Sequence, residues 1–206
     1  MKIAAFIDDG LKNEEFYRSY LQSIRTATGV DAVAVIMAGD ILHSGFLCAE
    51  SKEVRSRRLV SAGTDLVIES PVHGVILKPD TYAYVMAMLM QKLGCIDTLF
   101  LPCKKGDKAL LEQAAQLMLL APREYQQALR QLRPGRELYE IIPMAVDRFV
   151  PGALDAMSKP MNRFAVEVKN AMRLSYCPTK AMLCEVDFEP DPEGICEETD
   201  AKLGAL

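Results

Sequence analysis

Acidic residues follow the first apolar run of the sequence and return shortly afterwards. Asp8 and Asp9 come directly after the run Ile3 to Ile7, and Glu14 and Glu15 begin the next polar segment. Carboxylates supply the oxygen ligands that magnesium prefers, and without a cation they repel a phosphate group. The alternative is that Glu14 and Glu15 only stabilise a helix start, where the helix dipole favours negative charge. The cluster therefore predicts either a cation or neutral ligand, or a simple helix terminus.

A second set of polar residues could contact an acidic ligand. Lys52 and Arg55 lie in a basic segment with Arg57 and Arg58, and Asn162 stands near the start of a later amphipathic segment. The alternative for the basic residues is a solvated helix face. The alternative for Asn162 is a helix cap, because an asparagine side chain satisfies backbone N–H groups at a helix start. Both interpretations stay open at this point.

Histidine and cysteine chemistry is not indicated. His43 and His73 are the only histidines, and the six cysteines include no Cys-x-x-Cys pair, so the sequence predicts no zinc site and reduced thiols. Cys103 follows an apolar run near the expected cleft, but no histidine is placed to activate it. His43 is expected to be a surface residue. No catalytic residue is assigned from the sequence, and neither is an oligomeric state.

The elements that must position these residues alternate between strands and helices. Alternation at this spacing predicts a Rossmann-like α/β fold, a doubly wound and mostly parallel sheet with right-handed crossovers, in which the first strand is central. Ligands of such sheets bind outside the carboxyl ends of the strands. Strands are expected over 2–7, 32–37, 66–68, 96–101 and 181–186, and helices over 13–27, 51–62, 79–93, 109–120, 123–132 and 160–174.

The chain is expected to divide into three parts. These are an α/β core over residues 1–106, a helical C-terminal portion over 107–186 packed on the core, and an acidic tail over 187–206. The net charge of −4 argues against a strongly basic nucleic-acid surface. No apolar run reaches the roughly 18 residues that a membrane span needs, and no signal peptide precedes the first strand. A cytoplasmic location is expected.

Several stretches resemble a known family. MKIAAFIDD, GVDAVAVIMAGD and SKEVRSRRLVSAGTDLVIESP are similar to the bacterial tRNA(Met) cytidine acetate ligases, members of the HIGH nucleotidyltransferase superfamily. Lys159-Pro160-Met161-Asn162 resembles the family's Pro-Asn-Asn segment. The resemblance implies the fold described above and a role in tRNA modification.

The resemblance also implies an activity and a set of ligand contacts. The family activates acetate with ATP, forms acetyl-adenylate and passes the acetyl group to a cytidine of tRNA. ATP and magnesium are therefore the implied cofactors, and a nucleotide and tRNA the implied partners. The implied cofactor-binding residues are Ile7, Asp8, Asp9, Gly39, Lys52, Arg55 and Asn162.

The sequence departs from the family where phosphate chemistry takes place. Glu14-Glu15-Phe16-Tyr17 stands in place of the superfamily's His-x-Gly-His motif, Pro102 in place of a glycine, and Glu185-Val186 where an arginine is placed. The family's tRNA-handling region starts about where this sequence stops. We therefore expect weak or absent adenylyl transfer. One alternative is a pseudoenzyme that serves as a binding or regulatory module, and another is an enzyme that rebuilt its site from the acidic cluster and a metal.

Overall fold

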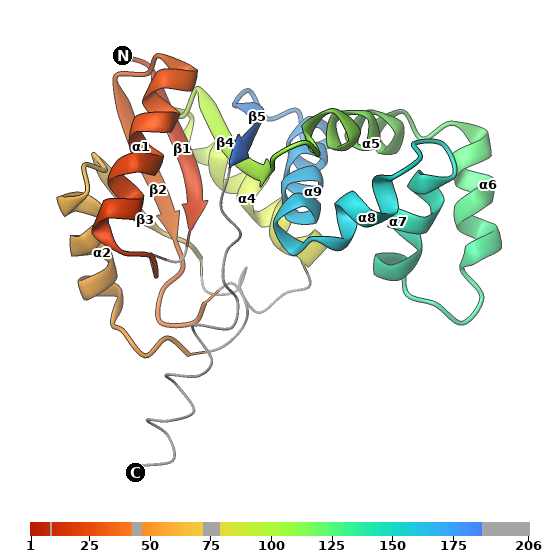
Figure 1. Ribbon diagram of the computed structural model, residues 1–206, viewed down its shortest axis with the longest axis horizontal. Helices are drawn as coiled ribbons and strands as arrows, with labels where there is room; N and C mark the ends of the chain where they lie inside the picture. Colours follow the sequence, from red (N-terminus) through yellow and green to blue (C-terminus); the bar gives the residue numbers. More distant parts are fainter. Residues whose placement is uncertain (9, 43–46, 72–78, 187–206) are drawn as a thin grey trace, which may run out of the picture.

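The computed structural model describes residues 1–8, 10–42, 47–71 and 79–186. It contains a five-stranded parallel sheet in the order β3-β2-β1-β4-β5, with β1 at its centre as predicted (Figure 1). The strands are β1 (Ile3–Asp8), β2 (Ala32–Met37), β3 (Leu66–Glu69), β4 (Thr98–Lys104) and β5 (Lys180–Val186). The predicted α/β fold class is confirmed.

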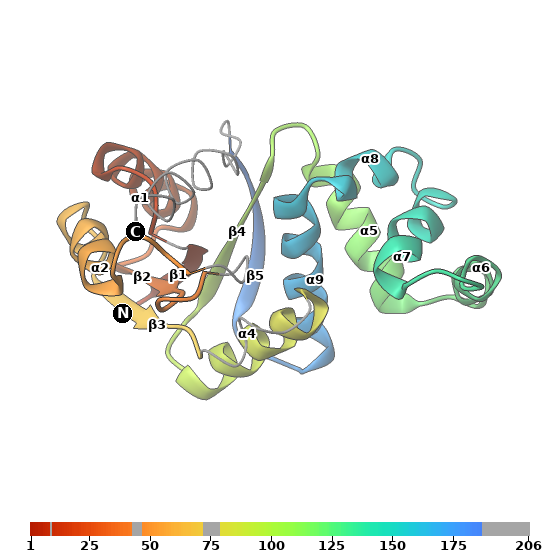
Figure 2. The same ribbon diagram turned by 90° about the horizontal axis from the view of Figure 1, so that it is seen from below.

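Helices cover both faces of the sheet. They are α1 (Glu14–Thr28), α2 (Lys52–Ser61), α4 (Pro79–Leu93), α5 (Lys108–Leu120), α6 (Arg123–Leu132), α7 (Leu138–Asp147), α8 (Ala153–Ser158) and α9 (Pro160–Leu174). Helices α1 and α2 pack on one face, whereas α4 and α9 pack on the other (Figure 2). Helices α5 to α8 extend away from the sheet beyond α9 (Figure 1).

Strands β1 and β2 are buried on both faces of the sheet, as their uninterrupted apolar sequences predict. Ala4 and Phe6 of β1 face α1, while Ala5 faces the α4–α9 layer. The Phe6 ring meets the edge of Tyr20 from α1 at 5.3 Å between centroids, and Tyr20 meets Phe100 of β4 at 5.6 Å. This aromatic group fixes α1 on the sheet and so positions the start of α1 next to the end of β1.

Strand β4 begins and ends later than the sequence suggested. The strand predicted over 96–101 spans Thr98–Lys104 and includes Pro102, although proline lacks the N–H group that a sheet requires. Within the described part of the chain, only Thr98, Leu99 and Phe100 pair with β1, and from Leu101 onward β4 pairs with β5 alone. Pro102 therefore lies where one side of β4 has lost its neighbour, and the strand tolerates it.

Helices α7 and α8 were not predicted. Three prolines break up the apolar period in this region, and Pro143 lies inside α7 itself. A capping box between Glu137 and Glu140 nevertheless starts α7, and Ile141, Ala145 and Val146 bury its apolar face.

The three-part division remains a proposal. Strand β5 returns the chain to the sheet after the helices, alongside β4. The acidic segment 187–206, Asp9, His43 and His73 lie outside the described residues. Within the part that the structure describes, no helix has the length and apolar character needed to cross a membrane.

Candidate functional site

The expected site lies at the carboxyl ends of the strands, where β1 meets β4. From β1 the chain goes to β2 and β3 on one side, and β4 and β5 lie on the other side. Ligands bind at such a reversal of strand order in doubly wound sheets. The residues that follow β1, β2 and β4 therefore decide what this edge can hold.

The turn after β1 is closed by a hydrogen-bonded carboxylate. Oδ1 of Asp8 accepts the backbone N–H of Gly10 at 2.7 Å and the hydroxyl of Tyr17. The Tyr17 oxygen in turn accepts the N–H of Lys12 at 3.2 Å. The Tyr17 side chain is fully buried, and its burial, reinforced by the Asp8 charge, raises the pKa of Tyr17 above its usual value. The phenol is therefore held protonated as a donor to Asp8.

The start of α1 has a side-chain cap and an ion pair within the same helix. Asn13 caps the helix by accepting the Phe16 N–H at 2.8 Å, as predicted. Glu14 pairs with Arg18 one turn further along the same helix. The sequence predicted that Glu14 and Glu15 could gather with Asp8 and Asp9, but the structure gives Asp8 and Glu14 different partners. Ion pairs between residues four positions apart are common on exposed helix faces. The spacing of Glu14 and Arg18 could therefore have predicted this ion pair from the sequence.

Arg55 is buried, contrary to the solvated interpretation. Its guanidinium donates to the carbonyl oxygen of Ala38 at 3.1 Å, to that of Gly39, and through Nε to that of Glu50 at 3.2 Å. It has no exposed surface. Arg55 thus ties the loop after β2 to α2, and its charge is directed toward backbone carbonyl groups.

Lys52 lies near the end of β3. Its Nζ contacts both carboxylate oxygens of Glu69, at 3.0 and 2.9 Å, and the hydrogen bond to Glu69 raises the pKa of Lys52. Glu69 lies against Gly39, where a Cβ atom would come within 2.5 Å of Oε1. A side chain at position 39 would therefore displace the Glu69 carboxylate from its place beside the loop.

The sequence placed Arg58 only on the basic face of α2, but its side chain also contacts the turn after β1. It donates to the Gly10 carbonyl at 2.9 Å and holds Glu50 with two contacts of 2.7 and 2.8 Å. Gly10 has a φ of 76°, and a Cβ there would lie 3.0 Å from Sδ of Met37. The turns after β1 and β2 are therefore packed against each other and against α2.

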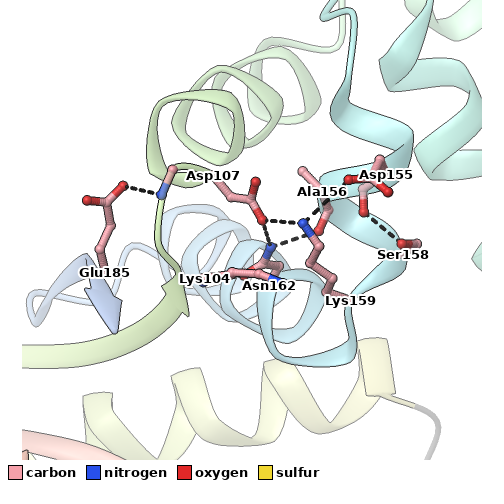
Figure 3. Close-up of polar contacts among 9 residues, drawn as sticks. Lys104, Asp107, Asp155, Ala156, Ser158, Lys159, Asn162 and Glu185 are labelled. Carbon is pink, nitrogen blue, oxygen red and sulfur yellow. Dashed lines mark hydrogen bonds and ion pairs between the residues drawn. The ribbon is translucent and has the colours of Figure 1, made fainter. Parts of the chain in front are cut away.

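Asn162 joins three segments at the end of β4 (Figure 3). Its Oδ1 accepts the Lys104 N–H at 2.8 Å, while its Nδ2 donates to Asp107 at 2.7 Å and to the Ala156 carbonyl at 2.8 Å. The side chain is fully buried. Its amide oxygen and nitrogen are thus engaged within the protein, and this role is wider than that of a helix cap.

The Asp107 carboxylate is the centre of this network (Figure 3). Partial burial alone would raise the pKa of Asp107, but the hydrogen bonds from Lys159, at 2.7 Å, and from Asn162 outweigh it and lower that pKa. Glu185, close to where the resemblance places an arginine, accepts the Gly106 N–H at 3.1 Å. The sequence did not identify Asp107 as a partner of Asn162, although its position directly before a predicted helix marks it as a polar residue at a helix start.

Two further positions singled out in the sequence, Ile7 and Cys103, lie in or against the core. Ile7 is half-buried and packs against the α4–α9 side of the core. Cys103 is fully buried, and burial raises the pKa of its thiol to about 12, so it remains a thiol at neutral pH. Among the described residues no three His, Cys, Asp or Glu side chains gather as a metal site requires.

Comparison with known proteins places the chain in a family. The family model described as HIGH Nucleotidyl Transferase matches residues 17–167. The chain belongs to this family, as the sequence resemblance predicted.

Curated relatives are tRNA(Met) cytidine acetate ligases. The Acetivibrio thermocellus protein is 26% identical over 112 residues, covering 54% of this chain and 27% of the relative. The Thermoanaerobacter sp. protein is 30% identical over 132 residues, 64% of this chain and 33% of the relative. The Bacillus subtilis protein is 31% identical over 106 residues, 50% of this chain and 25% of the relative. The matches thus span between a quarter and a third of these relatives.

The fold is similar to that of solved structures. Thermotoga maritima TmcAL bound with alpha-thio ATP superposes with a TM-score of 0.85 at 18% identity, covering 98% of this chain and 51% of that chain. The apo form of the same protein gives a TM-score of 0.83 at 17% identity, with 100% and 52% covered. At this identity the likeness establishes the fold, and the chain spans about half of the solved protein.

Proposed function

We propose that this protein is a binding module built on the HIGH nucleotidyltransferase fold, with weak or no adenylyl transfer. One observation carries the proposal. At the second imidazole position of the family motif, the buried Tyr17 hydroxyl donates to Asp8. Charge developing on a phosphate requires donors that are aimed at it. A protonated phenol directed at a carboxylate does not supply one.

The cations that match the family are also engaged. Arg55 donates to the Ala38 and Gly39 carbonyls, and Lys52 pairs with Glu69. A magnesium ion would compete at Asp8 with the Gly10 N–H and the Tyr17 hydroxyl, which both donate to its Oδ1. No chemical step through a metal follows from this arrangement.

A neutral ligand suits the edge better than a triphosphate. Carboxylates of Asp8 and Glu14 lie on either side of the first turn, and such charges oppose phosphate in a partly dry site. We propose a nucleoside, with Ile7, Asp8, Asp9, Gly39 and Lys52 as contact positions. The other two predicted residues, Arg55 and Asn162, are proposed to position the backbone around the nucleoside and not to contact the nucleoside themselves.

A second candidate is retained because family membership and the fold shared with TmcAL bound with alpha-thio ATP favour it. In that case the chain binds ATP and takes part in tRNA modification, as the names of its relatives describe for them. A cytoplasmic location is proposed for either candidate.

Calorimetry with the full chain separates the two candidates. Adenosine, ATP and CTP are titrated with and without magnesium, and pyrophosphate release is measured with ATP and acetate. The Bacillus subtilis relative serves as the positive control. We expect adenosine binding without pyrophosphate release. Pyrophosphate release that disappears in Lys52→Ala would overturn the proposal in favour of the second candidate.

A paired variant tests the electrostatic part of the proposal. Glu14→Gln combined with Glu15→Gln removes two negative charges from the start of α1, with Glu124→Gln at the start of α6 as the matched control. ATP binding that appears only in the double variant would show that the carboxylates exclude phosphate. Equal ATP binding by the wild type and both variants would contradict it.

A further inference from the structure

The carboxylate of Asp107 lies where two donors beside the end of β4 converge (Figure 3). Its Oδ2 accepts hydrogen bonds from Nζ of Lys159 and from Nδ2 of Asn162, both at 2.7 Å. An ammonium group and an amide N–H that point at one oxygen suit a phosphate oxygen as well as a carboxylate oxygen, because both are charged acceptors. The chain itself therefore supplies the anion that these donors hold.

The surroundings of Asp107 favour a negative charge. Partial burial alone would raise the pKa of Asp107, but the hydrogen bonds from Lys159 and Asn162, together with the charges of Lys159 and Lys104, lower it. The side chains of Asp107 and Lys159 are 15% and 29% exposed. The position is thus partly dry, where charges interact more strongly than in water, and it still borders the solvent from which a ligand arrives.

The amide donor is held independently of Asp107. Oδ1 of Asn162 accepts the Lys104 N–H at 2.8 Å, and its Nδ2 also donates to the Ala156 carbonyl at 2.8 Å. These two contacts fix the orientation of the amide. Removing the charge of Asp107 should therefore leave the Asn162 donor in place for another anion.

Other carboxylates near the turn do not replace Asp107. Asp155 lies 3.4 Å from Nζ of Lys159, but its side chain is 85% exposed, and water screens such a pair. Glu185 lies on the other side of the turn and accepts the Gly106 N–H at 3.1 Å (Figure 3). Asp107 is thus the carboxylate that the two donors share.

We propose that Asp107 occupies the position of a phosphate group beside the end of β4 and determines the ligand specificity of the carboxyl edge. A nucleoside phosphate would have to displace this carboxylate from Lys159, and two anions in a partly dry place repel each other. This inference rests on the proposed function, because it names the group that makes a nucleoside a better ligand than its phosphate.

Calorimetry with inorganic pyrophosphate and the full chain tests the proposal. Asp107→Asn keeps the shape of the side chain and removes its charge. We expect this variant to bind pyrophosphate at least about tenfold more tightly than the wild type, because the Lys159 charge is no longer neutralised. Adding Lys159→Met to Asp107→Asn should abolish the gain. Unchanged pyrophosphate affinity in Asp107→Asn would overturn the proposal.

Two further variants serve as controls. Asp155→Asn removes the exposed carboxylate beside Lys159 and should give no gain, since water already screens that pair. An equal gain in Asp155→Asn would show a general effect of net charge and would count against Asp107. Asp107→Ser is the second substitution at the site, and thermal unfolding shows which variants are folded. The absence of a gain in the folded Asp107 variants would refute the assignment.

Adenosine and adenosine 5′-monophosphate separate this inference from the proposed function. The wild type should bind adenosine in preference to the monophosphate, and Asp107→Asn should shift that preference toward the monophosphate. Equal binding of both by the wild type would contradict the role of Asp107. Binding of neither would contradict the proposed function alone, because pyrophosphate contains no nucleoside and its affinity still tests Asp107.

Discussion

Two parts of the carboxyl edge of the sheet both hold polar side chains, but they pair them differently. Arg55 and Asn162 are fully buried and bound to backbone atoms of other segments. Lys52 and Glu69, near the end of β3, are 37% and 47% exposed and contact each other. Buried groups cannot exchange their partners for water, whereas exposed ones can. Substitutions at Arg55 and Asn162 should therefore change stability, and substitutions at Lys52 and Glu69 should change ligand binding more than stability.

The largest effect is expected for Arg55→Ala. The change leaves carbonyl groups of Ala38, Gly39 and Glu50 without this donor. We expect the free energy of unfolding to fall by about 3–5 kcal/mol in urea denaturation, since each buried group left unpaired costs roughly 1–3 kcal/mol. The exposed Arg57 in the same helix provides the control, and Arg57→Ala should stay within about 0.5 kcal/mol. Similar losses for both variants would contradict the structural role of Arg55.

A smaller loss is expected for Asn162→Ala. The side chain accepts from Lys104 and donates to Asp107 and Ala156, so its removal separates the end of β4 from α8 and α9. A decrease of about 2–3 kcal/mol in the free energy of unfolding is expected. Gln127→Ala, at an exposed amide on α6, is the comparison. Unchanged stability with altered ligand affinity would instead show that Asn162 serves binding.

Tyr17→Phe should have a still smaller effect. The variant keeps the buried ring and removes the hydroxyl between Asp8 and Lys12. Asp8 still accepts from Gly10, so a loss of about 1 kcal/mol is expected by thermal or urea unfolding. Tyr84→Phe, at a tyrosine that is 46% exposed, should be neutral. A stability gain in Tyr17→Phe would show that the short turn is strained by this hydrogen bond.

The smallest effect is a pH dependence at Asp107. Its pKa is lowered in the folded protein, so its contribution to stability is present above the ordinary value of 3.8 and is lost as the pH falls through the lower folded value. The stability difference between wild type and Asp107→Asn should therefore be constant near neutral pH and shrink below about pH 4. Urea denaturation at a series of pH values measures it. A difference that grows on acidification would show that the folded pKa is raised.

Much of the fold was predictable because local pattern and global fold agree. The apolar runs at 32–37 and 181–186 became β2 and β5, and the proline and glycine at the ends of 79–93 mark α4. Helix α7 was missed because Pro143 lies inside it and disrupts the period that reveals a helix, and α8 is only six residues long. The end of β4 was misplaced because Pro102 is compatible with a strand only where pairing with β1 stops, which no local pattern shows.

The site was less predictable, since its contacts join residues that are distant in sequence. Asp8 and Arg55 were selected as contact positions, but their actual partners, Tyr17 and the carbonyl groups after β2, depend on the packing of α1 and α2. The same holds for Asn162 and Asp107, which are 55 residues apart. Sequence patterns identify polar residues at strand ends, whereas the tertiary structure determines which of them remain available to a ligand.

The close approach of Glu69 to Gly39 joins the end of β3 to the loop that follows β2. Oε1 of Glu69 contacts Lys52 and also lies beside the loop that Arg55 holds. A ligand that contacted Lys52 would compete with Glu69 for the ammonium group, and the released carboxylate would be free to move beside Gly39. Binding at Lys52 and the conformation of the loop at Gly39 would then influence each other by equal free energies.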